Sequence, residues 1–210
     1  MIRVLIVDDH AIVREGIKRL LESRTDIRVV GEASTGEEFL ARVLEGLFDV
    51  ALLDIQMPGI GGIEALREIT RMNREIAILV FSMHAEEVYA VRALREGAAG
   101  YLSKSAPPSR VLDAIRTVAS GRRYIAPDVA EALASYVVRD EKRPSHETLS
   151  QREFEVFLRL ARGRTTTEIA NELALSVKTV STYRTRVLDK LGVRSNAELV
   201  RHALENDLIT

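Results

Sequence analysis

Residues 50–59 read VALLDIQMPG, an apolar run that stops at one carboxylate and then breaks at Pro58 and Gly59. A continuous apolar run is typical of a strand that is buried on both faces of a parallel sheet. Asp54 then lies at the carboxyl end of a central strand, where open α/β sheets hold their binding sites. A carboxylate in that position acts as a metal ligand, a general base or a nucleophile for a phosphoryl group, although Asp also begins ordinary turns.

The sequence around this stretch alternates β-rich runs with helical patterns over the first 120 residues. The predicted strands span residues 2–7, 27–33, 48–53, 76–81 and 99–102. Apolar residues at helical spacing lie between them, and the later predicted helices span residues 63–72, 86–96 and 109–119. Short connections between such units imply right-handed crossovers. We therefore expect an α/β domain with a doubly wound, flavodoxin-like parallel sheet of five strands and helices on both faces.

Composition limits the class of protein. A chain of 210 residues, 46% of them hydrophobic, is long and apolar enough to form one or two domains, each with a hydrophobic core. The chain has no cysteine, which fits a reducing compartment. We find no leader pattern and no apolar run of membrane-spanning length, so we expect a cytoplasmic protein without a membrane partner. The formal net charge of -1 hides an asymmetry, because the segment from Lys178 to Arg194 alone carries a net charge of +4.

Ionisable and polar side chains follow four of the predicted strands. They are Asp8 and Asp9 after the first strand, Asp54 after the third, Ser82 after the fourth and Lys104 after the fifth. Each alone fits a helix cap, a turn or a solvated surface group. Together at one sheet edge, three carboxylates repel one another unless cations intervene. Hard oxygen ligands favour Mg²⁺, so we expect Mg²⁺ and Lys104 to neutralise this edge.

At these residues the sequence resembles the receiver domain of two-component response regulators. The resemblance covers about the first 120 residues and includes the segments 8–9, 53–59, 81–82 and 97–104. It implies that Asp54 is the phosphoacceptor, with Asp9, Asp8 and the backbone carbonyl of Gln56 as metal ligands. It also implies that Lys104 contacts the phosphoryl group and that Ser82 and Tyr101 are switch residues. From spacing alone, Tyr101 instead reads as an amphipathic surface residue. One departure is Ser105, which stands where the family usually has proline.

The pattern changes after residue 120. We expect a linker over residues 121–146, with a short helix after Pro127 and a charged stretch at 139–147 that offers nothing to bury. We expect residues 147–210 to form a separate all-helical domain. Its first predicted helix runs from Ser150 to Ala161, and the second follows a capping-box pattern at Thr165 and Glu168. The third runs from Ser176 to about Leu191.

The last of these helices has two different sides. At 100° per residue, Val187 and Leu191 lie close to Val180, whereas Lys178, Thr182, Thr185 and Asp189 lie opposite. A short helix, a tight turn and a longer helix with small polar and basic side chains outward is typical of a helix-turn-helix. Such a face suits DNA, although charged faces are more often simply solvated.

Segments 149–153, 168–170 and 178–193 resemble the LuxR-type DNA-binding domain. Ser181 and Tyr183 depart from the Lys and His that are commoner there. We expect the aliphatic part of the Arg184 side chain to pack against the domain and its guanidinium to reach outward to a DNA phosphate. The resemblance implies DNA contacts by Thr165, Thr167, Lys178, Thr179, Ser181, Thr182, Arg184, Thr185, Arg186 and Lys190.

A receiver followed by this domain is the NarL/FixJ-type arrangement, and segments 59–62 and 121–125 resemble its UvrY/GacA-like branch. The resemblance implies a transcription factor that is controlled by phosphorylation of Asp54 and acts as a homodimer on double-stranded DNA. A sensor histidine kinase is the expected phosphodonor, and RNA polymerase is a candidate partner. Two alternatives stay open: the same regulator working without phosphate, and an aspartyl-phosphate phosphatase. Against the phosphatase, Gln56 stands two residues after Asp54, where a second acid is absent.

Overall fold

The computed structural model describes residues 1–72, 75–83, 87–126, 129–130 and 145–209. The chain divides into two compact units, Met1–Arg139 and Asp140–Thr210, and each is described by itself. No helix within these described residues is long and apolar enough to cross a membrane.

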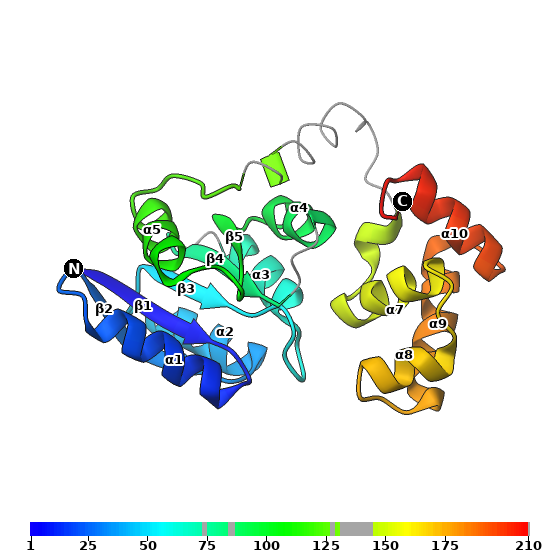
Figure 1. The fold of residues 1–210 in the computed structure, drawn as a ribbon, viewed down its shortest axis with the longest axis horizontal. Coiled ribbons are helices and arrows are strands. Elements are labelled where there is room, and N and C mark those ends of the chain that lie inside the picture. Colours follow the sequence, from blue (N-terminus) through cyan, green and yellow to red (C-terminus); the bar gives the residue numbers. More distant parts are fainter. Residues whose placement is uncertain (73–74, 84–86, 127–128, 131–144, 210) are drawn as a thin grey trace. The chain divides into compact units, whose positions relative to one another are not determined.

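The first unit is built on a five-stranded parallel sheet with the strand order β2-β1-β3-β4-β5 (Figure 1). Its strands are β1 (Ile2–Val7), β2 (Ile27–Ala33), β3 (Val50–Leu53), β4 (Ala77–Ser82) and β5 (Gly100–Ser103). This order is the flavodoxin-like arrangement, so the predicted fold class is confirmed. The strands differ from the predicted ranges by at most two residues at an end.

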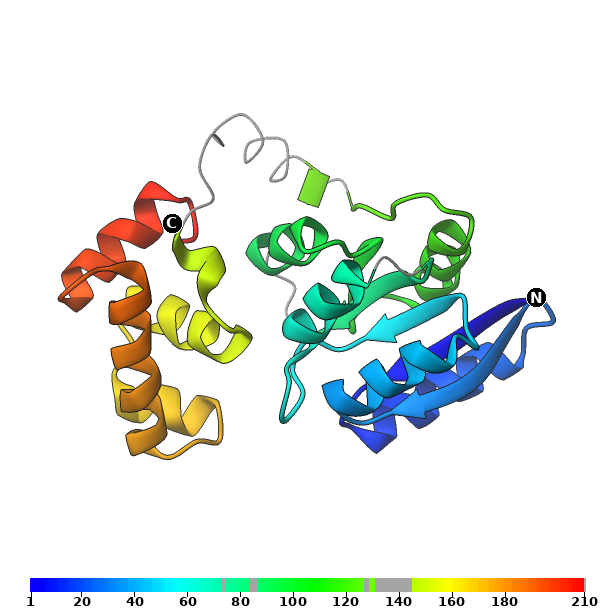
Figure 2. The ribbon, with the colours of Figure 1, turned by 180° about the vertical axis from the view of Figure 1, so that it is seen from behind.

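Helices cover both faces of this sheet, as Figures 1 and 2 show from opposite sides. They are α1 (Ala11–Glu22), α2 (Gly36–Glu45), α3 (Gly62–Arg71), α4 (Glu87–Arg95) and α5 (Pro108–Ala119). Helices α1 and α5 share one apolar core with the facing side chains of the sheet, including Ile17, Leu21, Leu52 and Ile115. Right-handed crossovers on this strand order place α2, α3 and α4 on the other face.

Strand β3 is the central strand that its apolar sequence predicts. It pairs with β1 on one side and with β4 on the other. Its four residues are at most 2% exposed. The ladder continues one residue further, because the Asp54 amide donates to the carbonyl of Val7 at 2.8 Å. Asp54 is thereby fixed at the carboxyl edge of the sheet.

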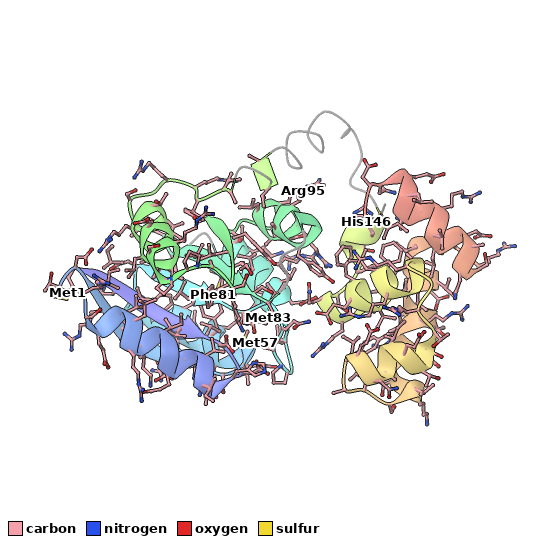
Figure 3. All side chains as sticks on the ribbon, in the orientation of Figure 1. Met1, Met57, Phe81, Met83, Arg95 and His146 are labelled. Carbon is pink, nitrogen blue, oxygen red and sulfur yellow. The ribbon has the colours of Figure 1, made fainter. Side chains whose placement is uncertain are left out.

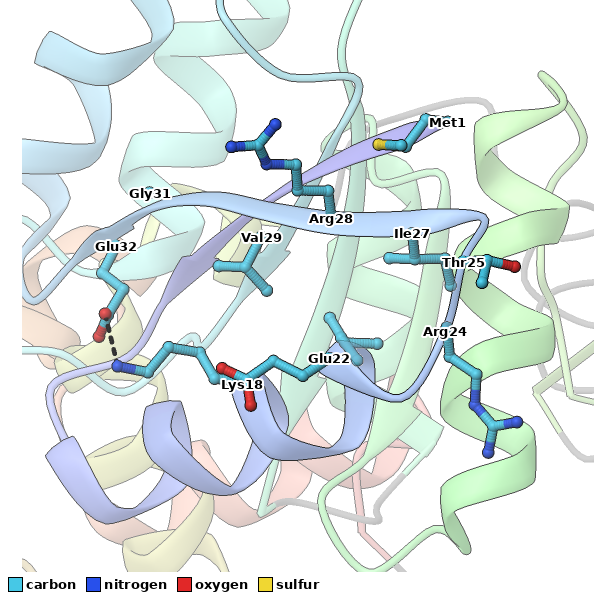
Figure 4. Close-up of a pocket in the computed structure, with 11 residues that line it drawn as sticks. Met1, Lys18, Glu22, Arg24, Thr25, Ile27, Arg28, Val29, Gly31 and Glu32 are labelled. Atoms are coloured by element: carbon cyan, nitrogen blue, oxygen red, sulfur yellow. Dashed lines mark hydrogen bonds and ion pairs between the residues drawn. The ribbon is translucent and has the colours of Figure 1, made fainter.

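Strand β2 is an edge strand with a bulge in its ladder with β1. Its register with β1 passes from Val29 to Gly31, which leaves Val30 as a bulge residue, 40% exposed. A groove lies between β2 and α1, and the Lys18 ammonium spans it to Glu32 at 2.8 Å (Figure 4). A bulge and a charge pair at an edge oppose pairing with a further strand.

The second unit is entirely helical. It consists of η1 (Ser145–Thr148), α7 (Gln151–Ala161), α8 (Thr166–Glu172), α9 (Val177–Leu191) and α10 (Asn196–Glu205). Serine or threonine caps open four of these helices, and the capping boxes Ser150–Glu153 and Thr165–Glu168 are complete. Each box satisfies two amide groups that the helix leaves without a partner, so the sequence itself fixes where these helices begin.

The predicted linker differs from the structure at both ends. The Tyr124 amide donates to the carbonyl of Ala99 at 2.9 Å, so the chain still pairs with the first unit there. At the other end, His146 of η1, labelled in Figure 3, is only 3% exposed. Its ring centroid lies 6.2 Å from that of Phe154 and 5.6 Å from that of His202. The interpretation of His146 as a solvated linker residue was wrong, because its ring offers apolar surface that a count of charges ignores. Most of the short helix predicted after Pro127 lies outside the described residues.

Candidate functional site

The ends of three strands bring together the predicted ionisable groups. The Lys104 ammonium, after β5, lies 2.6 Å from Asp8 Oδ2 and 2.6 Å from Asp54 Oδ2. The three side chains are only 3–6% exposed. A lysine between two buried carboxylates neutralises one of their charges and holds both oxygens on one side of the pocket.

Asp9 and His10 complete this cluster on its open side. One ligand atom from each of Asp8, Asp9, His10 and Asp54 can be chosen so that all four lie within 4.8 Å of one another. The His10 Nδ1 lies 2.7 Å from Asp9 Oδ1, and the His10 amide donates to Asp8 Oδ1 at 2.9 Å. Asp9 and His10 are exposed, with side chains 30% and 65% accessible. Solutes therefore reach the cluster from this side.

The electrostatics of the pocket favour a cation. Burial raises the pKa of the Asp54 carboxyl, although the charge of Lys104 and its hydrogen bond act in the opposite direction. Burial also opposes the charged form of Lys104, but the charges and hydrogen bonds of Asp54 and Asp8 outweigh it and raise the pKa of the ammonium. Asp8, Asp9 and Asp54 against one ammonium leave an excess of two negative charges, which a divalent cation would balance. The three carboxylates therefore fit a hard divalent ion.

A tight loop after β3 shapes the floor of the pocket. The Gln56 amide donates to Asp54 Oδ1 at 3.1 Å, which turns the chain back over the carboxylate. Further along, Gly59 has φ +72°, a conformation that favours glycine, and the Ile60 amide donates to Glu37 Oε1 of α2 at 3.1 Å. Sequence reasoning missed Glu37, because nothing in the spacing of residues 37 and 60 indicates that they meet. It also missed His10, although His10 directly follows the two acids.

The two predicted switch residues are buried on neighbouring strands of the sheet. Ser82 ends β4 and is fully buried, and its carbonyl accepts a hydrogen bond from the Lys104 amide at 2.8 Å. Tyr101 lies on β5 and is 6% exposed, so the surface position that spacing alone favours was wrong. Although β5 is an edge strand, α4 and α5 pack against it, so the amphipathic pattern does not predict exposure of Tyr101.

In the second unit, helices α8 and α9 form a helix-turn-helix. The turn between them contains Ala174 at φ +52°, and the Leu175 amide returns to the carbonyl of Ala170 at 2.8 Å. Helix α9 buries Val180, Val187 and Leu191, the side that its sequence predicts. Its opposite face is exposed over residues Lys178, Ser181, Thr182, Thr185 and Arg186.

Two basic residues of α9 are held within the unit. The Lys190 ammonium lies 2.6 Å from Glu153 Oε2 of α7. Burial favours the neutral form of Glu153, but hydrogen bonds from Lys190 and Ser150 outweigh it and lower the pKa. Arg184 is half-buried and donates from Nε to Asn196 Oδ1 of α10 at 2.9 Å. Both residues therefore stabilise the packing of α9 against its neighbours.

Two family models match the chain, one for each unit. Residues 4–116 match the response regulator receiver domain, and residues 147–203 match the bacterial regulatory proteins of the luxR family. The chain belongs to the response regulator family. Because both matches fall where the structure has its α/β unit and its helix-turn-helix unit, the response regulator has a receiver domain followed by a LuxR-type DNA-binding domain.

Relatives of this response regulator share the whole arrangement. The response regulator UvrY of Escherichia coli is 44% identical over 209 residues, which cover 99% of this chain and 96% of the relative. The response regulator GacA of Pseudomonas aeruginosa is 40% identical over 210 residues, covering 100% and 98%. The solved structure of RcsB from Salmonella enterica serovar Typhimurium, bound to a promoter in the presence of the phosphomimetic BeF3-, is 28% identical with a TM-score of 0.60 and covers 96% and 97%. The chain is thus similar to transcription regulators over its full length.

Proposed function

We propose that this response regulator is a transcription factor whose DNA binding is switched by phosphorylation of Asp54. The observation that carries the proposal is the position of the Asp54 carboxylate, buried at the end of β3 and held 2.6 Å from the Lys104 ammonium. Nearby Asp8 and Asp9 make the pocket suitable for a divalent cation as well. A carboxylate between two cationic groups is prepared to accept a phosphoryl group.

The chemistry is an in-line transfer. A carboxylate oxygen of Asp54 attacks phosphorus and forms an acyl phosphate, while the bond from phosphorus to the donor breaks and its electron pair leaves with the donor. Lys104 contacts the new phosphoryl oxygens and neutralises part of their charge. Mg²⁺, held by Asp9, Asp54 and the carbonyl of Gln56 with Asp8 assisting, would neutralise the rest. Catalysis by the protein is therefore mainly positioning and charge.

The switch follows from the added charge. A phosphoryl group brings nearly two negative charges and three strong acceptors next to Ser82. We propose that the Ser82 hydroxyl moves to donate to it and that Tyr101 takes the space behind Ser82. Support comes from the burial of both side chains on neighbouring strands β4 and β5, where Tyr101 pairs with Val80, two residues before Ser82.

The DNA-reading surface is the exposed face of α9. Lys178 and Arg186 are exposed and suit phosphates, whereas Thr182 and Thr185 are short enough to approach base edges. The hydroxyls of Thr182 and Thr185 donate to the carbonyls of Lys178 and Ser181, at 3.0 and 3.2 Å, and keep lone pairs for an outside donor. Thr165, Thr167, Thr179 and Ser181 form the border of the proposed surface. Arg184 and Lys190 contribute less, because their side chains are engaged inside the unit.

The proposed partners follow from the two units. A sensor histidine kinase donates the phosphoryl group, and double-stranded DNA is the target, read by a homodimer whose two α9 helices enter successive major grooves. RNA polymerase is a further candidate partner. We propose that the protein acts in the cytoplasm and needs no membrane contact.

The test of the proposed function is phosphoryl incorporation from a small-molecule phosphodonor. The intact chain should gain the mass of one phosphoryl group when Mg²⁺ is present, and chelation of the metal should prevent the gain until Mg²⁺ is added back. Peptide mass spectrometry should place the group on Asp54, and Asp54→Asn should gain nothing. Incorporation in Asp54→Asn equal to that of the wild type would reject the assignment.

A second expected result concerns DNA. Lys178→Ala and Arg186→Ala should each weaken binding to all sequences and reduce the salt dependence of the affinity by about one counterion, because phosphate contacts release bound cations. Thr182→Ala and Thr185→Ala should instead change the preference among sequences. The measurement is fluorescence anisotropy over a series of salt concentrations. Arg71→Ala, which removes another exposed charge from α3 of the other unit, is the control and should leave the slope unchanged. Unchanged slopes for both α9 variants would place the binding surface elsewhere.

A further inference from the structure

We propose that His10 supplies a nitrogen ligand to the acidic pocket, so that this receiver binds transition-metal divalent cations such as Mn²⁺, Co²⁺ and Ni²⁺ far more tightly than an all-oxygen pocket would. The inference rests on the proposed function, since it concerns the metal that assists Asp54. It goes further by assigning His10 a role and by changing the class of cation that the site prefers.

Geometry places the imidazole where a ligand must be. The Nδ1 atom of His10 is 2.7 Å from Asp9 Oδ1 and 3.3 Å from Asp8 Oδ1. One nitrogen of the ring also lies within 4.8 Å of one carboxylate oxygen each of Asp8, Asp9 and Asp54. An ion that Asp9 and Asp54 hold would therefore have an imidazole nitrogen close beside it.

A hydrogen bond holds the backbone of His10 in place, whereas its ring makes no hydrogen bond to the amides of α1. Its amide donates to Asp8 Oδ1 at 2.9 Å, which ties the residue to the pocket wall. His10 is the N-cap of α1, yet its side chain makes no capping hydrogen bond. The ring instead lies toward the carboxylates and keeps 65% of its surface accessible. A cation arriving from solvent meets it together with Asp9.

The chemical type of the ligand atoms decides which cation the pocket prefers. Mg²⁺ takes oxygen ligands and keeps several waters, so an imidazole adds little to its binding. Imidazole nitrogen suits first-row transition ions, whose affinities for such sites rise from Mn²⁺ through Co²⁺ and Ni²⁺ to Cu²⁺. Carboxylates with one nitrogen should therefore bind Ni²⁺ and Co²⁺ more tightly than Mg²⁺, and His10 should set a large part of the difference.

The experiment measures metal binding by the intact, untagged chain. Isothermal titration calorimetry gives the affinities for Mg²⁺, Mn²⁺ and Ni²⁺, and visible absorption of bound Co²⁺ reports a nitrogen ligand directly. The variant is His10→Asn, which keeps a polar side chain of similar reach, and thermal unfolding verifies that it folds. Asp9→Asn, which retains His10 but loses a carboxylate, identifies binding at the pocket as distinct from the other histidines.

The expected result for His10→Asn is a loss of Ni²⁺ affinity of about tenfold or more, a similar effect on Co²⁺ with an altered absorption spectrum, and a change in Mg²⁺ affinity of less than about threefold. An unchanged ratio of Ni²⁺ to Mg²⁺ affinity, or an unaltered Co²⁺ spectrum, would overturn the inference. The same proteins are tested for Mg²⁺-dependent incorporation of phosphate. If incorporation is normal and the ratio is unchanged, only the role of His10 fails. If the wild type binds these ions but takes no phosphoryl group on Asp54, it is the proposed function that fails.

Discussion

Lys104→Met should destabilise the metal-free receiver domain by about 3–5 kcal/mol, because removal of one partner from a buried ion pair leaves the other charges uncompensated. The Lys104 ammonium contacts Asp8 and Asp54 at 2.6 Å each, with side chains 3–6% exposed. Methionine has a similar length and no charge, so the change isolates the ammonium. Thermal and denaturant unfolding measure the loss. Saturating Mg²⁺ should recover part of it, because a divalent ion bound to the folded pocket replaces the missing charge and stabilises the native state.

The matched control is Lys18→Met on α1 of the same domain. Lys18 also contacts two carboxylates, Glu15 and Glu32, at 3.1 and 2.8 Å, but its side chain is 29% exposed. Such partly solvated pairs contribute about 1 kcal/mol or less, and Mg²⁺ should not restore what is lost. Equal losses for the two lysines, or a Lys104→Met protein that Mg²⁺ does not stabilise, would contradict the account of the pocket.

Gly62→Ala should be the second large effect. A Cβ at this position would collide with the carbonyl oxygen of Asp54 and would lie 2.7 Å from the Cα of Ile55, and both are backbone atoms. The first turn of α3 must then move away from the phosphoacceptor. We expect a loss of about 1–3 kcal/mol in the free energy of unfolding, as for other overpacked cores. We also expect slower phosphoryl incorporation, since Asp54 shifts with the loop.

Gly16→Ala is the control, because it makes the same change in open space. Gly16 lies inside α1, and an added Cβ meets nothing within 4 Å. Alanine in a helix interior should raise the stability by about 0.5–1 kcal/mol, so the two variants differ in sign. Chemical denaturation of both proteins gives the comparison. A Gly62→Ala domain as stable as the wild type would show that the loop after β3 tolerates displacement.

Much of the receiver fold follows from local patterns. The apolar run ending at Asp54 predicts a central parallel strand, and β3 is that strand. Parallel strands bring their carboxyl ends to one edge, so the strand-end residues Asp8, Asp54 and Lys104 were expected to meet, and they do. In the second unit, the capping-box pattern at Thr165 and Glu168 predicts the start of α8, and the 100° spacing of Val180, Val187 and Leu191 predicts the buried side of α9.

Other features depend on contacts between distant residues, which a single sequence does not reveal. Glu37 meets Ile60 across 23 positions, and Lys190 meets Glu153 across 37. From the sequence alone, Lys190 is expected to be a surface cation, because its contact with Glu153 of α7 is known only from the structure. His146 reads as part of a charged linker, because its burial depends on Phe154 and His202, which come later in the chain. Local charge and hydropathy carry no information about such pairs.

The central claim is that the phosphoryl group on Asp54 controls the DNA affinity of the second unit. The most direct measurement is the affinity of the intact chain for double-stranded DNA, at fixed salt and with Mg²⁺, before and after treatment with a small phosphodonor. Typical couplings of 1–3 kcal/mol between two sites predict that the wild type binds about 5–150-fold more tightly once phosphorylated, while Asp54→Asn does not respond. If mass spectrometry confirms the phosphoryl group on Asp54 and the affinity stays the same, or if Asp54→Asn gains as much as the wild type, the account is contradicted.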